Sequence, residues 1–138
     1  GYIMDKDIKE FVEAIGASEP QPDEKIYNTY RDLFKRHNYF SLNGMFIIIK
    51  ISRSDRPFWG IGRKFIELMK NTDNYYLILL VSGKEGWFFS KGEIDSNIRQ
   101  GRWKLRDKDD NYKINPPLPD KNSFNSAKTF LSKSNLGK

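Results

Sequence analysis

The chain contains no cysteine and only one histidine, and these two shortages exclude several kinds of site. Without cysteine there is no disulfide bond, no thiolate nucleophile and no cysteine-ligated zinc. His37, the single histidine, lies in a segment with helical spacing and cannot alone build a zinc centre or a histidine-dependent nuclease centre. We therefore expect no metal site of these kinds, and we interpret His37 as a surface residue of a helix.

Long hydrophobic runs are also missing. The two longest, "MFIIIKI" at 45–51 and "YYLILLV" at 75–81, are far shorter than the roughly 18 residues needed to cross a bilayer. Neither run lies at the N-terminus in front of a cleavage site, as a secretion signal would. Together with the absence of cysteine, this predicts a soluble cytoplasmic protein without a membrane partner.

Positive charge is in excess and is unevenly distributed. The net charge is +6 overall, and it divides into −2 for residues 1–49, +6 for 50–106 and +2 for 107–138. Positive charge concentrated on a folded segment favours a polyanionic partner, because basic side chains that neutralise phosphates release condensed counterions. The alternative, a basic surface that only keeps the protein soluble, stays open on charge alone.

At 138 residues the chain is predicted to form one domain, with a helical part at 1–40. Apolar residues recur every three or four positions in "MDKDIKEFVEAIG" at 4–16 and in "DEKIYNTYRDLFKRHN" at 23–38. This spacing predicts a pair of amphipathic helices, the first ended by Gly16.

The part from 45 to 133 is predicted to mix strands with short helices, which gives an α+β fold with a small antiparallel or mixed sheet. The predicted strands are 45–52, 75–82 and 86–90, and a further hairpin is predicted at 102–114. The predicted helices are 62–70, 91–101 and 123–133, with Ser123 or Asn125 as the cap of the last one.

The stretch "RSDRPFWGIGRKF" at 53–65 contains two glycines among basic and aromatic residues. We expect Gly60 and Gly62 to form a tight turn from strand to helix, anchored to the core by Phe58 and Trp59. A dinucleotide-binding fingerprint would need a third glycine where Phe65 stands, and no Walker-type phosphate loop occurs.

Nuclease chemistry of the PD-(D/E)xK type needs an acid two positions before a strand lysine, where carboxylates hold a metal. Ile48 stands two positions before Lys50, and Glu67 is one position too far from Lys70. We therefore expect a non-catalytic chain without metal or cofactor, and we keep a nuclease of this type as an alternative.

Two clusters of basic and amide side chains each follow a predicted strand. The first cluster is Arg53, Ser54, Asp55, Arg56, Arg63 and Lys64, and the second is Lys91, Asn97, Arg99, Gln100, Arg102, Lys104 and Arg106. Arginine can donate two hydrogen bonds to guanine, asparagine and glutamine can pair with adenine, and lysine can neutralise phosphate. We predict that the clusters form two arms that bind double-stranded DNA, although solvated surface charges would look the same in sequence.

The strand that ends in this basic loop is followed by "FWGIGRKFIEL", "NYYLILLVSGKEGWFFSKGEI", "IRQGRW" and "NYKIN". This order resembles the DNA-recognition domains of prokaryotic restriction enzymes of the EcoRII and BfiI type and of the McrBC-related LlaJI systems. The resemblance covers roughly 45–133 and implies a β pseudobarrel with two loop-bearing arms in the major groove. It also implies a module of a restriction system whose DNA cleavage is supplied by a separate nuclease domain or subunit.

Two other functions stay open at this point. A protein-interaction domain would use the same basic surface to bind an acidic partner. A reader of single strands, RNA or modified bases would expose aromatic side chains for stacking, and Trp59, Trp87 and Trp103 are candidates, although we expect all three in the core.

Overall fold

The computed structural model describes residues 4–21, 31, 38–71 and 74–137. The helices in these ranges are α1 (Lys6–Ile15), α3 (Arg63–Met69), α4 (Lys91–Arg99) and α5 (Ala127–Ser134), with a short 3-10 helix η1 (Asp120–Asn122). The strands are β1 (Tyr39–Leu42), β2 (Met45–Ile51), β3 (Trp59–Gly62), β4 (Tyr75–Leu80), β5 (Gly86–Ser90), β6 (Lys104–Arg106), β7 (Asn111–Ile114) and β8 (Ser123–Phe124).

Helix α1 confirms the first predicted helix. The Asp5 carboxylate caps it by accepting hydrogen bonds from the backbone N–H groups of Asp7 at 2.8 Å and Ile8 at 3.2 Å. Gly16 ends it in a left-handed conformation with φ of 78°, which glycine adopts without steric cost. The second predicted helix and His37 lie largely or wholly outside the described residues.

Five strands form a central sheet in the order β1-β2-β4-β5-β8. Strands β2 and β4 are parallel, and the other neighbours are antiparallel. The predicted strands 45–52, 75–82 and 86–90 are confirmed, and β4 and β5 form the predicted hairpin. Strand β1 is an additional element, joined to β2 by a two-residue turn of Asn43 and Gly44, both with positive φ angles.

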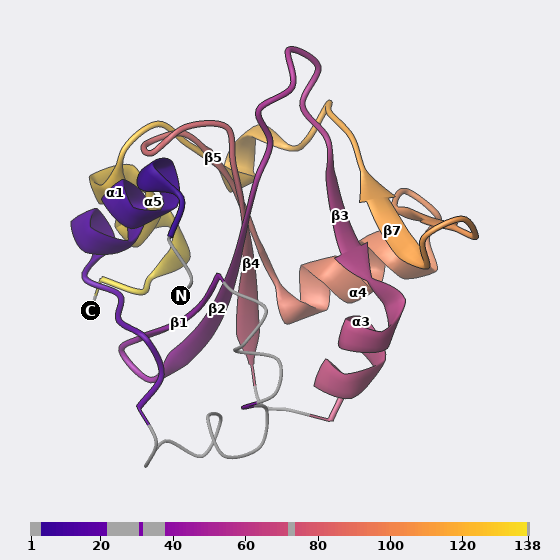
Figure 1. Ribbon diagram of the computed structural model, residues 1–138, viewed down its shortest axis with the longest axis horizontal. Coiled ribbons are helices and arrows are strands. Elements are labelled where there is room, and N and C mark those ends of the chain that lie inside the picture. Colours follow the sequence, from indigo (N-terminus) through magenta and orange to yellow (C-terminus); the bar gives the residue numbers. More distant parts are fainter. Residues whose placement is uncertain (1–3, 22–30, 32–37, 72–73, 138) are drawn as a thin grey trace.

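The central sheet is covered on both faces (Figure 1). Helices α1 and α5 pack on one face, and a second sheet packs with α3 and α4 on the other (Figure 1). In β2, Ile47 and Ile49 contribute to the core under the helices, whereas Phe46 and Ile48 contribute to the core between the sheets. A strand buried on both faces needs an almost continuous apolar run, and Lys50 is the one charged residue in β2.

The second sheet is antiparallel and has the order β3-β7-β6. Strands β6 and β7 confirm the hairpin predicted at 102–114. Strand β3 shows that the tight turn predicted at Gly60 and Gly62 is wrong: both glycines are extended, pair with β7 and lack a positive φ. Phe58 is 47% exposed and is not a core anchor, whereas Trp59 is 3% exposed and is one.

The ends of the last two helices are fixed by serine caps. Ser90 and Glu93 form a reciprocal capping box at the start of α4, and Gly101, with φ of 74°, follows its end. The cap of α5 is Ser126, whose hydroxyl accepts a hydrogen bond from the N–H of Thr129 at 3.1 Å. The expectation of Ser123 or Asn125 is therefore wrong by one to three positions.

The α+β class is thus confirmed, with eight strands and four α-helices in the described ranges. These strands form two separate sheets, and no closed barrel is present in this part of the chain. No helix in the described part is both long and apolar enough to span a membrane.

Candidate nucleic-acid interface

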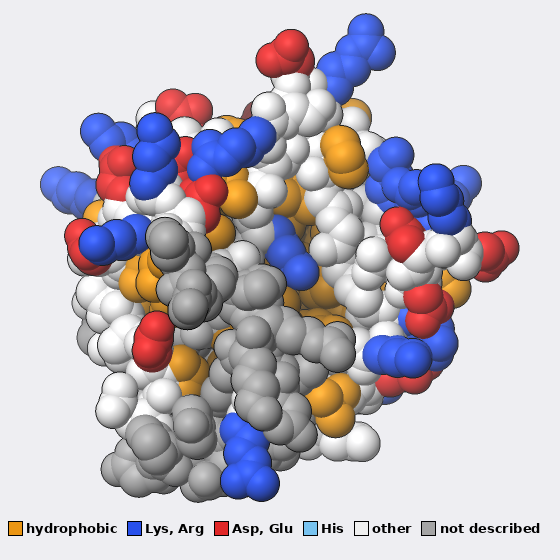
Figure 2. All heavy atoms as spheres, in the orientation of Figure 1, with side chains coloured by type: hydrophobic (Ala, Val, Ile, Leu, Met, Phe, Trp, Pro, Cys, Tyr) orange, Lys and Arg blue, Asp and Glu red, His pale blue; other side chains and the backbone are white. Residues whose placement is uncertain are grey.

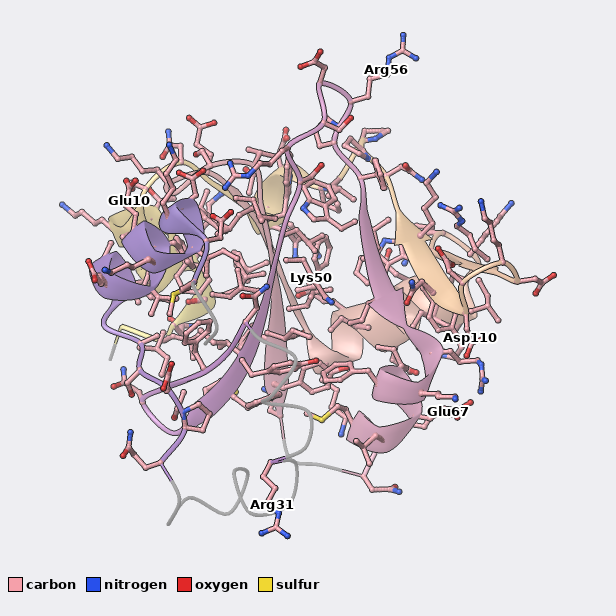
Figure 3. The ribbon with its side chains drawn as sticks, viewed as in Figure 1. Glu10, Arg31, Lys50, Arg56, Glu67 and Asp110 are labelled. Atoms are coloured by element: carbon pink, nitrogen blue, oxygen red, sulfur yellow. The ribbon has the colours of Figure 1, made fainter. Side chains whose placement is uncertain are left out.

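The loop at 52–58 carries most of the first cluster and projects from one end of the molecule (Figure 1). The buried hydroxyl of Ser52 fixes its base by accepting hydrogen bonds from the N–H groups of Ser54 at 3.4 Å and Phe58 at 3.2 Å. The Ser54 hydroxyl accepts from the N–H of Arg56 at 3.2 Å. Arg56 lies at the tip and points to solvent (Figure 3). The loop therefore presents this guanidinium from a fixed base.

Arg53, in the same loop, is held against α1. Its guanidinium forms ion pairs with Asp5 and, at 2.7 Å, with Asp7. Partial burial acts to raise the pKa of Asp5, but hydrogen bonds from Arg53 and from backbone N–H groups lower that pKa below its ordinary value. Asp55 is exposed beside Arg56. Arg53 must release two carboxylates before it can contact a phosphate.

Arg63 and Lys64 begin α3, directly after β3. The Arg63 guanidinium donates to the Asp110 carboxylate at 2.8 and 3.0 Å and to Glu67 at 2.8 Å. The hydrogen bonds with Arg63 lower the pKa of Asp110, and those with Asp110 and Glu67 raise the pKa of Arg63. Arg63 thus ties α3 to the turn before β7, whereas Lys64 is exposed and has no salt bridge in the described ranges.

The amides of the second cluster surround Arg102 at the end of α4. Asn97 accepts from Arg102 Nε at 2.7 Å, Gln100 accepts from its Nη1, and Ser96 accepts from its Nη2 at 3.4 Å. The ring of Trp103 packs edge-on against Phe89 and anchors the turn that follows. Asn97 and Gln100 therefore orient Arg102, and base contact by either amide would require this network to open.

The remaining members of the second cluster on α4 lie at its two ends. Arg99 pairs with Asp95 at 3.2 Å on the exposed side of the helix. Lys91 lies at the first turn and donates to the backbone carbonyl of Lys70 at 2.8 Å. Because the helix separates Lys91 from Arg102, the structure does not bring Lys91 together with the rest of the cluster.

The outward face of the three-stranded sheet gathers residues from three strands, and we call it the basic face. In β3 and β7 its members alternate with core residues, whereas in β6 they flank Leu105, which is 39% exposed. The members are Gly60, Gly62, Lys104, Arg106, Asn111 and Lys113. Cross-strand pairing arranges them in two rows. One row runs from Gly60 through Lys113 to Lys104, and the other from Gly62 through Asn111 to Arg106.

The first of these rows is locally unfavourable for a sheet. Lys104 and Lys113 are directly opposite each other, and like charges in this position destabilise an antiparallel pair by roughly 0.2–1 kcal/mol. Gly60, next in the row, contributes no side chain to pack and weakens the strand. In the described part of the chain neither lysine has a salt bridge, and Lys113 instead lies 5.2 Å from the ring centroid of Phe58. The row therefore leaves two cations beside an open stretch of backbone.

Only Lys104 and Arg106 of the predicted site residues belong to the basic face. Sequence reasoning missed Lys113 and Asn111, because they lie beyond the second cluster and are brought in by the pairing of β7 with both neighbours. The signal that could have found them is the alternation of "NYKI", in which Tyr112 and Ile114 point to the core. In Figure 2 basic side chains, with some acidic ones beside them, gather over this side of the molecule.

The tryptophans are mostly core residues, as expected. Trp59 and Trp103 are each 3% exposed, and Trp59 donates a hydrogen bond to the Leu80 carbonyl at 3.1 Å. Trp87 is partly buried and packs edge-on against Trp59. The large aromatic side chain exposed beside the basic face is Phe58.

Acidic and histidine side chains form no group of three that could hold a metal ion within the described residues. Comparisons with models of protein families, with curated proteins and with solved structures found no match to this chain.

Proposed function

We propose that this chain binds double-stranded DNA through the basic face, flanked by the loop at 52–58 and by the end of α4. In this proposal Lys104, Lys113 and Arg106 neutralise phosphates, and the arginines of the two flanking arms, Arg56 and Arg102, reach toward base edges. The chain then acts as the recognition module of a prokaryotic restriction system, and a separate nuclease domain or subunit cleaves the DNA.

One observation carries the proposal: Lys104 and Lys113 lie directly opposite each other with no acidic partner in the described ranges. Two ammonium groups in this position repel each other, and a row of phosphates is a partner that reverses the repulsion. Residue choices that destabilise a strand pair locally, such as two opposed lysines, occur mainly at functional sites.

The shape of the basic face also supports a nucleic-acid partner. Glycines at Gly60 and Gly62 let another backbone approach the strand closely. The β6–β7 hairpin is a two-stranded antiparallel ribbon, and the major groove of DNA is wide enough to admit such a ribbon. The loop at 52–58 leads into β3 and the turn after α4 leads into β6, and these are the two edge strands of this sheet. Both segments can therefore flank a groove that lies across the sheet.

The restriction-system part of the proposal rests on the resemblance described for 45–133. A pseudobarrel remains part of that hypothesis. It is supported by two sheets that share one core, in which Ile48 of β2, Ile61 of β3 and Leu79 of β4 take part. The role of a non-catalytic module likewise comes from the resemblance and from the lack of a PD-(D/E)xK spacing at Lys50 and Lys70.

The test is a binding titration of the purified chain with a fluorescent duplex of about two helical turns, followed by anisotropy at several salt concentrations. We expect binding whose affinity falls steeply with salt, and no cleavage after incubation with Mg²⁺ or Mn²⁺. Selection from a random duplex pool then identifies the preferred sequence.

Three outcomes would replace the proposal. Specific strand scission with either metal would favour the nuclease alternative. Tighter binding to single strands or RNA than to the duplex would favour a stacking reader, with Phe58 as the available aromatic side chain. Failure to bind any nucleic acid at about 0.05 M salt, where phosphate contacts are strong, would favour an acidic protein partner.

A further inference from the structure

Lys50 lies at a position of β2 whose side chain faces the apolar core between the two sheets. Side chains alternate along β2, so Lys50 points to the same side as Phe46 and Ile48, which belong to the core between the two sheets. Its register partner on β4 is Leu79, another member of that core. In Figure 3 Lys50 points into the space between the central sheet and β3.

The ammonium group of Lys50 has no ion pair or hydrogen bond to another residue in the described part of the chain. The side chain is partly buried, and this burial lowers the pKa of Lys50 below its ordinary value. An ammonium group removed from water without a partner costs free energy that an apolar side chain at the same position would not. Such a residue is expected where it meets a ligand.

A cleft of about 580 Å³ opens in front of Lys50. One part of its lining is apolar and aromatic and comprises Tyr39, Ile48, Ile61, Phe65 and Leu68. The other part is polar or charged, with Arg63, Lys64, Asp109, Asp110 and Asn111 beside Gly62. Tyr39 stacks on Phe46 with ring centroids 5.6 Å apart and lies 5.9 Å from the ring of Phe65. Figure 2 shows this hollow at the centre of the molecule, with a basic side chain at its base. The volume of the cleft lies within the range of sites for small organic molecules.

The charges at the rim of the cleft favour an anion. Asp110 is neutralised by Arg63 through hydrogen bonds of 2.8 and 3.0 Å, and Asp109 lies 3.9 Å from Arg106. Lys64 also lines the rim and has no salt bridge in the described ranges. Both acids are paired with arginines, and the positive charge of Lys64 also lowers the pKa of Asp110. Within the described residues, the lysines of the lining that form no salt bridge are Lys50 and Lys64.

We propose that this cleft binds a small organic anion in which a flat ring is joined to a phosphate or carboxylate group. The ring packs against Tyr39, Ile61 and Phe65, and the anionic group accepts a charge-assisted hydrogen bond from the Lys50 ammonium. The cleft volume suits a molecule of about the size of a nucleoside monophosphate. Gly62 and Asn111 of the basic face also line this cleft, but Lys50 lies on the inner side of β3, away from the outward lysines Lys104 and Lys113.

Calorimetric titration of the full chain with two probes tests this proposal. The probes are adenosine 5′-monophosphate and 2-naphthoate, compared with their uncharged counterparts adenosine and 2-naphthamide and with inorganic phosphate. We expect at least one charged probe to bind. Its uncharged counterpart should bind at least about tenfold more weakly, because the charge-assisted hydrogen bond is lost. Inorganic phosphate should also bind at least about tenfold more weakly, because it lacks the ring contacts. If one charged probe binds and the other does not, its ring and anionic group together define the class of ligand.

Variants then assign the binding to Lys50. Lys50→Met should lower the affinity for the charged probe by about tenfold or more, and Lys50→Arg, which keeps the charge, should retain part of it. Lys50→Gln provides a second neutral variant if the methionine variant does not fold. The control is Lys84→Met, at an exposed lysine in the β4–β5 turn, which should bind like the wild type.

Four results would overturn the proposal: no probe binds, the uncharged counterpart binds as tightly as the charged probe, inorganic phosphate binds as tightly as the charged probe, or both neutral Lys50 variants keep wild-type affinity. Duplex binding by Lys50→Met, measured in parallel, should equal that of the wild type. Failure of the cleft proposal is therefore distinguishable from failure of DNA binding.

Discussion

Replacing Lys104 and Lys113 together with glutamine tests the basic face at the two cations that lie directly opposite each other. Glutamine keeps most of the length of each side chain and removes only the charge. If both lysines contact phosphates, the double variant loses two of the contacts that release counterions on binding.

The expected size of the effect follows from counterion release. Each phosphate contact contributes about 0.9 to the slope of log K against log salt concentration, so the slope should become shallower by about 1.8. The same term predicts an affinity loss of roughly 60-fold at about 0.1 M salt and only about fivefold at about 0.4 M salt. The folded state should not suffer, because removing opposed like charges relieves roughly 0.2–1 kcal/mol of repulsion.

The assay is anisotropy of a labelled duplex across this salt range, with a thermal melt of each variant. A matched control is the Lys84→Gln/Lys128→Gln double variant, which lowers the net charge from +6 to +4 in the same way. Lys84 lies in the β4–β5 turn, and Lys128 lies on α5, on the face of the central sheet opposite the three-stranded sheet. Equal slopes for the two double variants would refute the basic face as the contact surface.

Three further substitutions separate function from fold. Gly60→Ala should fold at least as stably as the wild type, because its Cβ would be in ordinary contact at 3.5 Å from Asn111, but it should weaken duplex binding; melting and anisotropy measure the two effects. Gly86→Ala should lower the free energy of unfolding by about 2–4 kcal/mol or prevent folding, since its Cβ would lie 2.1 Å from the Leu79 carbonyl oxygen; a near-wild-type denaturant midpoint would contradict this packing. Asp5→Asn tests the pH dependence of the ion pair between Asp5 and Arg53. Folding lowers the pKa of the Asp5 carboxyl. The ionised carboxylate therefore stabilises the fold above its unfolded pKa of about 3.9, and this stabilisation is lost as pH falls through the folded pKa. The melting temperatures of wild type and this variant should therefore differ at about pH 7 and converge near about pH 2, and a constant difference would rule out the ion pair as its source.

The elements that sequence predicted well are those whose pattern is local. Helix α1 has an acid cap, an apolar face of period three to four and a terminal Gly16, all within twelve residues of sequence from Asp5. Strands β2 and β4 are apolar almost throughout, with Lys50 the one charged residue in β2, because both of their faces are buried. Such runs are recognisable without knowing their partners.

Three strands were missed: β1, β3 and the two-residue β8, which lies in the segment predicted to begin the last helix. The first two were missed for different physical reasons. Strand β1 was short, but Asn43 and Gly44 between it and β2 are a residue pair typical of tight hairpin turns, so its signal was present and overlooked. Strand β3 has the sequence "WGIG", and its extended form depends on pairing with residues 111–114, about fifty positions away. Local propensity favoured a turn there, and tertiary pairing overrode it.

The candidate site was predicted only in part because clusters were defined by neighbours in sequence. Lys104 and Arg106 were found in this way, but Lys113 joins them only through the register of β7 with β6. Sequence also could not show that Arg53 and Arg63 are held by carboxylates from distant segments. The charge of a side chain can be taken from the sequence, whereas its partner depends on the fold.

The locally unfavourable choices in this chain lie on the two sides of β3. On the outer side, Gly60 and the opposed Lys104 and Lys113 weaken the three-stranded sheet. On the inner side, Lys50 places an unpaired ammonium next to an apolar core. A sequence chosen for stability alone would have a β-branched residue in place of Gly60 and an apolar residue in place of Lys50. Because the outer surface is open and the inner one is a cleft, a long polyanion fits the outer surface and a small anion fits the cleft. Substitution of Lys104 and Lys113 should therefore weaken binding of the polyanion, and substitution of Lys50 should weaken binding of the small anion.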